Sequence, residues 1–250
     1  MSVQQEKFKE IADAIRDKTG EADLIKPSDF ADKVGEVYEA GEQAEYDRFW
    51  DAYQNNGNRT NYSMAFAESG SSNDIAWKVE TTYRPKYPLK PRIASQMYYC
   101  TRLPYEALKE VKFSDCTDFL QTFAYSPTEH LGVIDMSKAT RTSTTFLDCK
   151  QLHTIDKIIV SQTTPYNNPF MGVTNLQNLI IEGPIGKNGF NISASTLLTH
   201  DSLMSIINEL YNYSKDTSGT SWVCTLGTEN LAKLTDAEKV IATEKGWTLA

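Results

Sequence analysis

The chain has 250 residues, of which 40% are hydrophobic and 23% are charged. This composition can bury a core and excludes an intrinsically disordered chain. The formal net charge of −8 argues against a general nucleic-acid binder, which would carry excess positive charge to neutralise phosphates. No apolar run approaches the roughly 18 residues of a membrane span, so we expect no membrane insertion. The first residues are polar and lack the apolar run of a signal peptide, so we expect synthesis in the cytosol.

Residues 1–57 are predicted to be helical. Phe8, Ile11 and Ile15 recur at the spacing of one apolar helix face, and a second helix is expected to follow. Apolar residues between Phe30 and Ala44 then alternate in steps of four and three. That pattern fits an antiparallel helical hairpin and an oligomer seam equally well. We expect an attachment or oligomerisation segment.

Residues 58–95 are predicted to form an irregular β-type cap or linker. The segment is rich in aromatic, Gly, Ser and Pro residues. Its three closely spaced prolines, Pro85, Pro88 and Pro91, exclude a helix and a central strand, because proline has no backbone N–H to donate. A boundary with the following segment is therefore expected near residue 95.

Residues 96–190 repeat a short motif. Met97–Leu103 aligns with Phe146–Leu152, because both contain Cys and Leu three and six residues after a large apolar residue. Phe170–Leu176 has the same spacing with Val in the Cys position, and a weaker copy starts at Phe123, so the copies begin 26, 23 and 24 residues apart. A short apolar run after each copy predicts one parallel strand for each repeat. A period of roughly 20–29 residues is typical of leucine-rich repeats, whose turns stack and share one core.

Residues 191–250 are predicted to form an α/β unit that caps the open end of the repeats. A helix is expected after Thr199 and a second one over Thr235–Glu244, with Thr235 as its N-cap. Strands are expected at Ser221–Leu226 and Gly246–Leu249. The predicted fold class is therefore α/β: a helical segment, a short solenoid of repeats and a capping unit.

The sequence contains no convincing metal or disulfide site. Its cysteines lie far apart with no C-x-x-C pair, which predicts buried reduced thiols. His130 and His153 lie one repeat apart, but no third ligand recurs with them. We interpret His200 as part of a helix cap. We therefore expect no metal. The cysteines are Cys100, Cys116, Cys149 and Cys224.

Catalytic motifs are also missing from the sequence. The segment Gly183–Gly189 lacks the spacing and the hydroxyl residue of a phosphate-binding loop, and no G-x-S-x-G motif occurs. Asp115 and Asp118 could form a carboxylate pair for glycoside cleavage, but we interpret them as solvated surface. We expect no catalytic residue and no cofactor.

Five tyrosines between the inward positions of the repeats are the candidate partner-binding residues. Tyrosines held on a rigid frame offer large contact areas at small entropic cost, and their rings can stack on sugars. The alternative interpretation is that they are ordinary half-buried residues of the repeats. The five are Tyr98, Tyr99, Tyr105, Tyr125 and Tyr166.

The F-x-x-C-x-x-L repeats resemble the BspA-like leucine-rich repeats of bacterial surface and phage-encoded proteins. The segments Leu197–Leu210 and Ala242–Leu249 are similar to a terminal unit in prophage proteins of Gram-positive bacteria. Ile11–Gly20 resembles a helical module at the front of the same proteins. The family implies an adhesion or tail-associated protein and supplies no catalytic residues.

From this resemblance we expect a non-catalytic virion protein of a phage or prophage tail or baseplate. The N-terminal helices would contact other virion proteins and could form a homo-oligomer such as a trimer. The repeats would bind a protein or a host-surface glycan. A bacterial cell-surface adhesin is the alternative, and a glycan-degrading tail enzyme is a third hypothesis.

Overall fold

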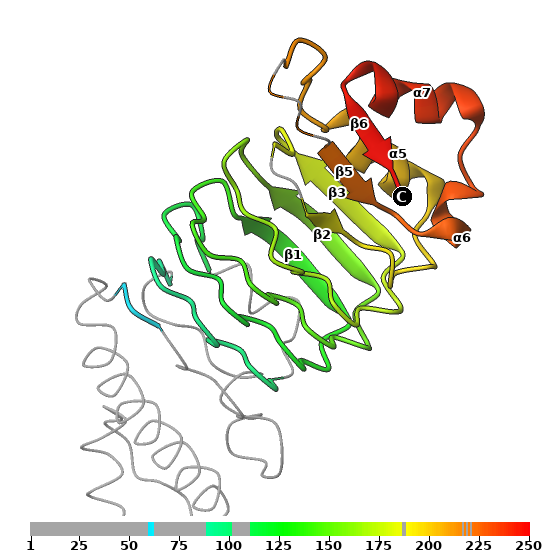
Figure 1. Cartoon of the computed structure of the whole chain (residues 1–250). Coiled ribbons are helices and arrows are strands. Elements are labelled where there is room, and N and C mark those ends of the chain that lie inside the picture. Colours follow the sequence, from blue (N-terminus) through cyan, green and yellow to red (C-terminus); the bar gives the residue numbers. More distant parts are fainter. Residues whose placement is uncertain are drawn as a thin grey trace, which may run out of the picture. The chain divides into compact units, whose positions relative to one another are not determined.

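The computed structural model describes residues 60–62, 89–101, 111–186, 189–216, 218, 220 and 222–250 (Figure 1). These residues form a mixed α/β fold with parallel strands in two three-stranded sheets, neither of which closes into a barrel. The helical segment predicted for residues 1–57, with its seam, lies outside the described residues. Most of the cap or linker predicted for residues 58–95 also lies outside them.

The first sheet contains one strand from each of three successive repeats. Strands β1 (His130–Asp135), β2 (Thr154–Ile159) and β3 (Asn178–Glu182) pair in parallel in the order β1-β2-β3 (Figure 1). The prediction of one short parallel strand for each of these repeats is confirmed. Their inward side chains are buried in two rows, which the strand register stacks on one another: Leu131, Ile155 and Leu179, then Ile134, Ile158 and Ile181.

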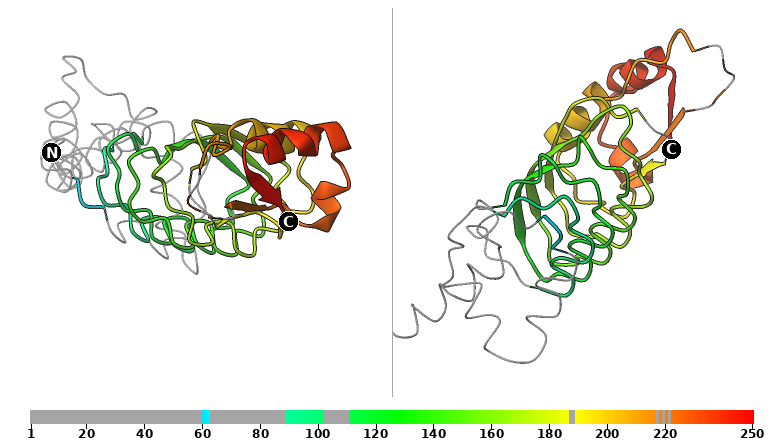
Figure 2. Two further views of the ribbon diagram at one scale, coloured as in Figure 1. Left: turned by 45° about the horizontal axis from the view of Figure 1, so that its top comes forward. Right: turned by 90° about the vertical axis from the view of Figure 1, so that its left-hand side faces the viewer.

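Outside the strands, each repeat runs through consecutive four-residue turns that hydrogen-bond to the next repeat. Backbone N–H groups alternate in direction: Phe123 N–H donates to Thr145 O at 2.9 Å, whereas Ala124 N–H donates back to Gln121 O at 3.1 Å. In the following turn, which Ser126 N–H closes by donating to Phe123 O at 3.0 Å, the third residue is Tyr125, and its φ of 59° is that of a type II turn. Successive repeats are therefore joined by backbone hydrogen bonds in the turns as well as in the sheet. Figure 2 shows the turns of successive repeats lying side by side.

A column of stacked aromatic rings runs through the core and corrects the sequence alignment. Tyr98, Phe123, Phe146 and Phe170 follow one another with centroids 5.7, 5.5 and 5.3 Å apart. Tyr98 N–H donates to the carbonyl oxygen of the residue before Phe123, and Phe123 N–H donates to that of the residue before Phe146. The first repeat therefore aligns through Tyr98 and not through Met97.

The one-residue error came from matching Cys100 to Cys149. The inward position level with Cys149 is held by Thr101, which is fully buried. Cys100 instead lies on the outward side at φ 55° and is partly exposed. A small polar residue can replace Cys at this inward position. An alignment that matches cysteines therefore places the first repeat one residue away from its position in the structure.

The C-terminal unit contains the second sheet and three helices (Figure 2). Its strands, β4 (Phe190–Asn191), β5 (Trp222–Thr225) and β6 (Trp247–Leu249), are parallel in that order. The predicted strands at residues 221–226 and 246–249 are confirmed by β5 and β6. The two residues of β4 are too few to produce a sequence pattern.

The two predicted helices of this unit are confirmed. Helix α5 (His200–Asn208) has Thr199 as its N-cap, and α7 (Asp236–Glu244) begins with a capping box formed by Thr235 and Glu238. The short helix α6 (Thr228–Leu231) was not predicted, because four residues show no helical periodicity.

Helix α5 covers the edge of β3 where a fourth strand would otherwise pair. The Ser202 hydroxyl accepts a hydrogen bond from Leu179 N–H at 2.9 Å, and the Ser205 hydroxyl accepts one from Ile181 N–H at 2.8 Å. These two serines, three residues apart, lie on one helix face. They satisfy the N–H groups that the strand edge would leave unpaired.

Candidate functional site

The structure separates the candidate tyrosines into core and surface residues. Tyr98 is 4% exposed and stacks in the aromatic column, so the prediction that it is available to a partner is wrong for the folded chain. Tyr166 is 6% exposed and packs edge-on against Phe190, which removes it from the surface in the same way. Tyr105 lies outside the described residues.

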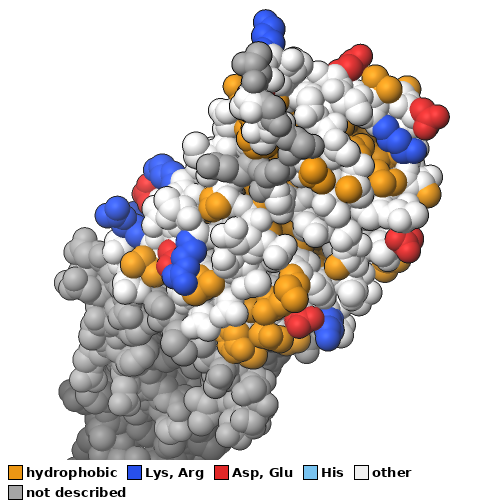
Figure 3. Space-filling view, in the orientation of Figure 1, with side chains coloured by type: hydrophobic (Ala, Val, Ile, Leu, Met, Phe, Trp, Pro, Cys, Tyr) orange, Lys and Arg blue, Asp and Glu red, His pale blue; other side chains and the backbone are white. Residues whose placement is uncertain are grey.

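Tyr99 and Tyr125 lie on the outward side of the turns. Tyr125 is 43% exposed, and its ring meets that of the half-buried Tyr99 edge-on at 5.4 Å. In the next two repeats the neighbouring outward positions hold Leu147 and Met171, the latter 57% exposed. We call these four residues the turn face. Figure 3 shows hydrophobic side chains gathered over the stacked turns, beside a few acidic and basic ones.

The turn face has a register set by backbone hydrogen bonds. Tyr125 N–H donates to Leu147 O at 2.7 Å, and Asp148 N–H donates to Met171 O at 2.9 Å. Each outward side chain is therefore held at a fixed height along the stack. A rigid array of this kind needs little ordering when it binds a partner.

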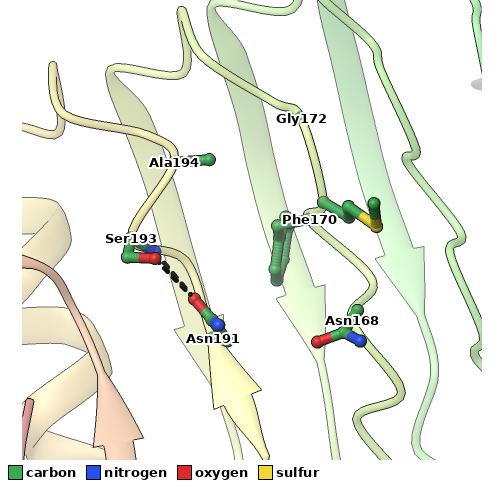
Figure 4. Close-up of a pocket in the computed structure, with 7 residues that line it drawn as sticks. Asn168, Phe170, Gly172, Asn191, Ser193 and Ala194 are labelled. Atoms are coloured by element: carbon green, nitrogen blue, oxygen red, sulfur yellow. Dashed lines mark hydrogen bonds between the residues drawn. The ribbon is translucent and has the colours of Figure 1, made fainter.

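A hollow of about 250 Å³ lies at the C-terminal end of the turn face. It separates the turn that contains Phe170, Met171 and Gly172 from the next segment of chain (Figure 4). None of the residues that line it is charged. Its polar lining residues are Asn168, Asn191 and Ser193, and Ala194 lines it together with the three residues of the turn.

The outer side of the first sheet carries charged side chains that pair with one another across neighbouring strands. His130 Nε2 lies 2.7 Å from Asp156 Oδ1, and Lys157 Nζ donates to Glu182 Oε2 at 2.5 Å. His130 is thus engaged with a carboxylate one strand away. No group of three or more His, Cys, Asp and Glu side chains suited to a metal ion occurs in the described part of the chain.

The carboxylates considered for glycoside cleavage each face a cation from the next repeat. Asp115 Oδ1 accepts a hydrogen bond from Lys138 Nζ at 2.5 Å, and Asp118 Oδ2 accepts one from Arg141 at 3.3 Å. The hydrogen bond and charge of Lys138 lower the pKa of Asp115, which is the wrong direction for a general acid.

The buried cysteines lack the properties of a reactive thiol. Burial raises the pKa of Cys116, Cys149 and Cys224 to about 12 in each case. Thiolate is the nucleophilic form, so these side chains are unreactive near neutral pH. His200, expected in a helix cap, is the first residue of α5, and its Nε2 lies 2.8 Å from Glu238 Oε1 of α7.

Comparison of the chain with protein-family models, curated proteins and solved structures finds no match. The described residues also include no helix long and apolar enough to cross a membrane. The turn face and its hollow are therefore the features of the described residues that bear on function. Tyr99 and Tyr125 are among the residues predicted from the sequence. The hollow has no sequence signal, because one wall comes from the last repeat and the other from the start of the C-terminal unit.

Proposed function

We propose that the stacked turns are BspA-like leucine-rich repeats, and that the chain is a non-catalytic binding protein of a phage or prophage tail or baseplate. Its repeats bind a host-surface glycan or protein. The N-terminal segment, residues 1–57, attaches it to other virion proteins and could form an oligomer.

The observation that carries the proposal is an aromatic pair, formed by the exposed Tyr125 and the half-buried Tyr99, on a hydrogen-bonded frame. Tyr125 is exposed, and Tyr99 supports its ring edge-on. Aromatic side chains with few rotatable bonds contribute large contact area, and they are enriched where proteins bind one another. The backbone bonds between repeats hold both tyrosines in place without a ligand.

The test is binding of the fluorescently labelled full chain to whole Gram-positive cells. The double variant Tyr99→Ser, Tyr125→Ser is expected to reduce affinity at least about tenfold, because both rings of the pair are lost. Tyr211→Ser is the matched control, since Tyr211 is 37% exposed but lies after α5 in the C-terminal unit. Equal binding by the double variant and the wild type would contradict a role for the turn face.

The bacterial cell-surface adhesin is the second candidate function, and it requires the same turn face. The two differ in where the protein is found. Mass spectrometry of purified, induced phage particles would detect a virion component together with tail proteins. Recovery from the cell envelope alone would favour the adhesin.

A further inference from the structure

Two small residues, Gly172 and Ala194, line the hollow beside Met171. Gly172 has φ 74°, and a Cβ atom built on it would lie 2.3 Å from Asp148 Oδ1, so a larger residue is disfavoured here. Ala194 faces it from the next segment with a single methyl group (Figure 4).

Two carboxamides face each other across this hollow (Figure 4). Asn191 Oδ1 accepts hydrogen bonds from Ser193 N–H at 3.1 Å and from the Ser193 hydroxyl at 2.8 Å. That use of the oxygen fixes the amide orientation and leaves the Nδ2 donor for a ligand. The Asn168 carboxamide makes no hydrogen bond to any described residue, so both its donor and its acceptor are available.

These groups select an uncharged, polyhydroxylated ligand. A charged group would enter a site whose lining contains no opposite charge to pair with it. Carboxamides both donate and accept, which matches hydroxyl and acetamido groups. Met171 supplies an exposed apolar side chain at the rim for the C–H surface of a ring.

We propose that the hollow bounded by Asn168, Gly172, Asn191 and Ala194 binds one uncharged sugar ring of a host-surface glycan. The proposal rests on the glycan-binding form of the function above and names the place where a terminal or side-chain sugar enters. The carboxamides of Asn168 and Asn191 orient the ring, and Met171 covers it.

Methyl NMR of the full chain labelled with [¹³C-methyl]methionine tests the proposal directly. Glucose, galactose, N-acetylglucosamine, N-acetylgalactosamine and rhamnose are the probes, with glucuronate as the charged comparison. At least one neutral sugar is expected to shift the Met171 signal, assigned with Met171→Leu. Ala194→Leu should weaken that binding at least about tenfold by filling the hollow, whereas Ala237→Leu, on the exposed surface of α7, should leave it unchanged.

A second variant removes the polar contact without straining the backbone. Asn168 has φ 50°, a conformation that glycine adopts freely, so Asn168→Gly should fold normally. Loss of its hydrogen bonds is expected to weaken sugar binding roughly two- to tenfold. Thermal unfolding of each variant checks that the fold is retained.

The outcomes separate this inference from the proposed function. If no neutral sugar moves the Met171 signal, if glucuronate binds best, or if Ala194→Leu binds as the wild type does, the sugar site is wrong. Cell binding that persists under those results leaves the proposed function standing with another ligand. If the wild-type chain binds neither cells nor sugars, both proposals fail.

Discussion

Single residues in the turns adopt backbone conformations that most side chains avoid. Two outward positions in each described repeat have positive φ, and Asn168 and Gly172 in the fourth repeat fill them with residues suited to that region. Tyr125 does not have this preference, yet it is held at φ 59° by the hydrogen bonds between repeats. Cys100 and Asp148, at the equivalent position of their repeats, have φ 55° and 52°, so the geometry of the turn sets this conformation.

Glycine is required at Gly183, where the chain turns after β3. Its φ is 95°, and a Cβ atom there would lie 2.3 Å from the backbone oxygen of Val160. Gly183→Ala is expected to lower the free energy of unfolding by more than about 2 kcal/mol, because backbone must move. Gly172→Ala should cost less, since the clashing atom ends the flexible side chain of Asp148. Urea denaturation of both variants compares them; an equal or reversed ranking would contradict this explanation.

At the scale of elements, the boundary between β3 and α5 depends on two hydroxyl groups. A helix that follows a parallel strand cannot continue the backbone ladder, so the edge N–H groups need other acceptors. Ser202 serves Leu179, and Ser205 serves Ile181. The sequence signal is a pair of serines at helical spacing, which is easily mistaken for an ordinary polar helix face.

Ser202→Ala is expected to lower the free energy of unfolding by about 1–3 kcal/mol. The change leaves the N–H of Leu179 buried without an acceptor, which costs more than the bond itself contributes. Chemical denaturation measures the loss. Ser214→Ala, at an exposed position in the following loop, is the control and should change stability by less than about 0.5 kcal/mol. Equal effects of the two variants would refute the role given to Ser202.

The capping box of α7 makes stability depend on pH. Hydrogen bonds from Thr235 N–H and the Thr235 hydroxyl, then His200, lower the pKa of Glu238 in the folded chain. Its contribution is therefore complete above the ordinary Glu pKa and disappears as the pH falls through the lowered value. Glu238→Gln should show a shallower loss of stability below about pH 4.5.

Thermal unfolding across that pH range measures the effect. Glu244→Gln makes the same charge change at the exposed other end of α7, where the carboxylate has no capping contact. It should retain the wild-type pH dependence. Identical profiles for the Glu238 variant and the wild type would mean that the capping box contributes nothing.

At the scale of the whole described fold, stability depends on contacts between neighbouring repeats. Phe146 lies in the middle of the aromatic column, with ring centroids 5.5 Å from Phe123 and 5.3 Å from Phe170. Each repeat buries its ring only because the next repeat covers it. Stability in such a stack is a sum of nearest-neighbour interfaces.

Phe146→Ala is expected to lower the free energy of unfolding by about 3–5 kcal/mol, since it leaves a cavity between two repeats. Met171→Ala, in the exposed position of the next repeat, should cost less than about 1 kcal/mol. Circular dichroism and tryptophan fluorescence follow unfolding of both. If Phe146→Ala lowers the free energy of unfolding no more than Met171→Ala does, the aromatic column does not stabilise the stack as described.

The sequence by itself determines the period of the repeats and their parallel strands. It also determines the helices α5 and α7 and the strands around Trp222 and Trp247. Each depends on local periodicity or on a capping residue within a few positions, and these signals can be read without knowledge of the fold. The burial of apolar residues such as Phe146 and Leu152 follows for the same reason.

Only the tertiary structure decided which residues share a level of the stack. It aligned Tyr98 with Phe123, buried Tyr98 and Tyr166, and left Tyr125 at the surface. A shift of one residue in the alignment exchanges inward and outward positions. The sequence pattern does not reveal this shift, because the inward position that Cys149 holds in another repeat is held here by Thr101. The hollow near Asn168 likewise depends on residues some twenty positions away, which meet only when the backbone hydrogen bonds between repeats set the register.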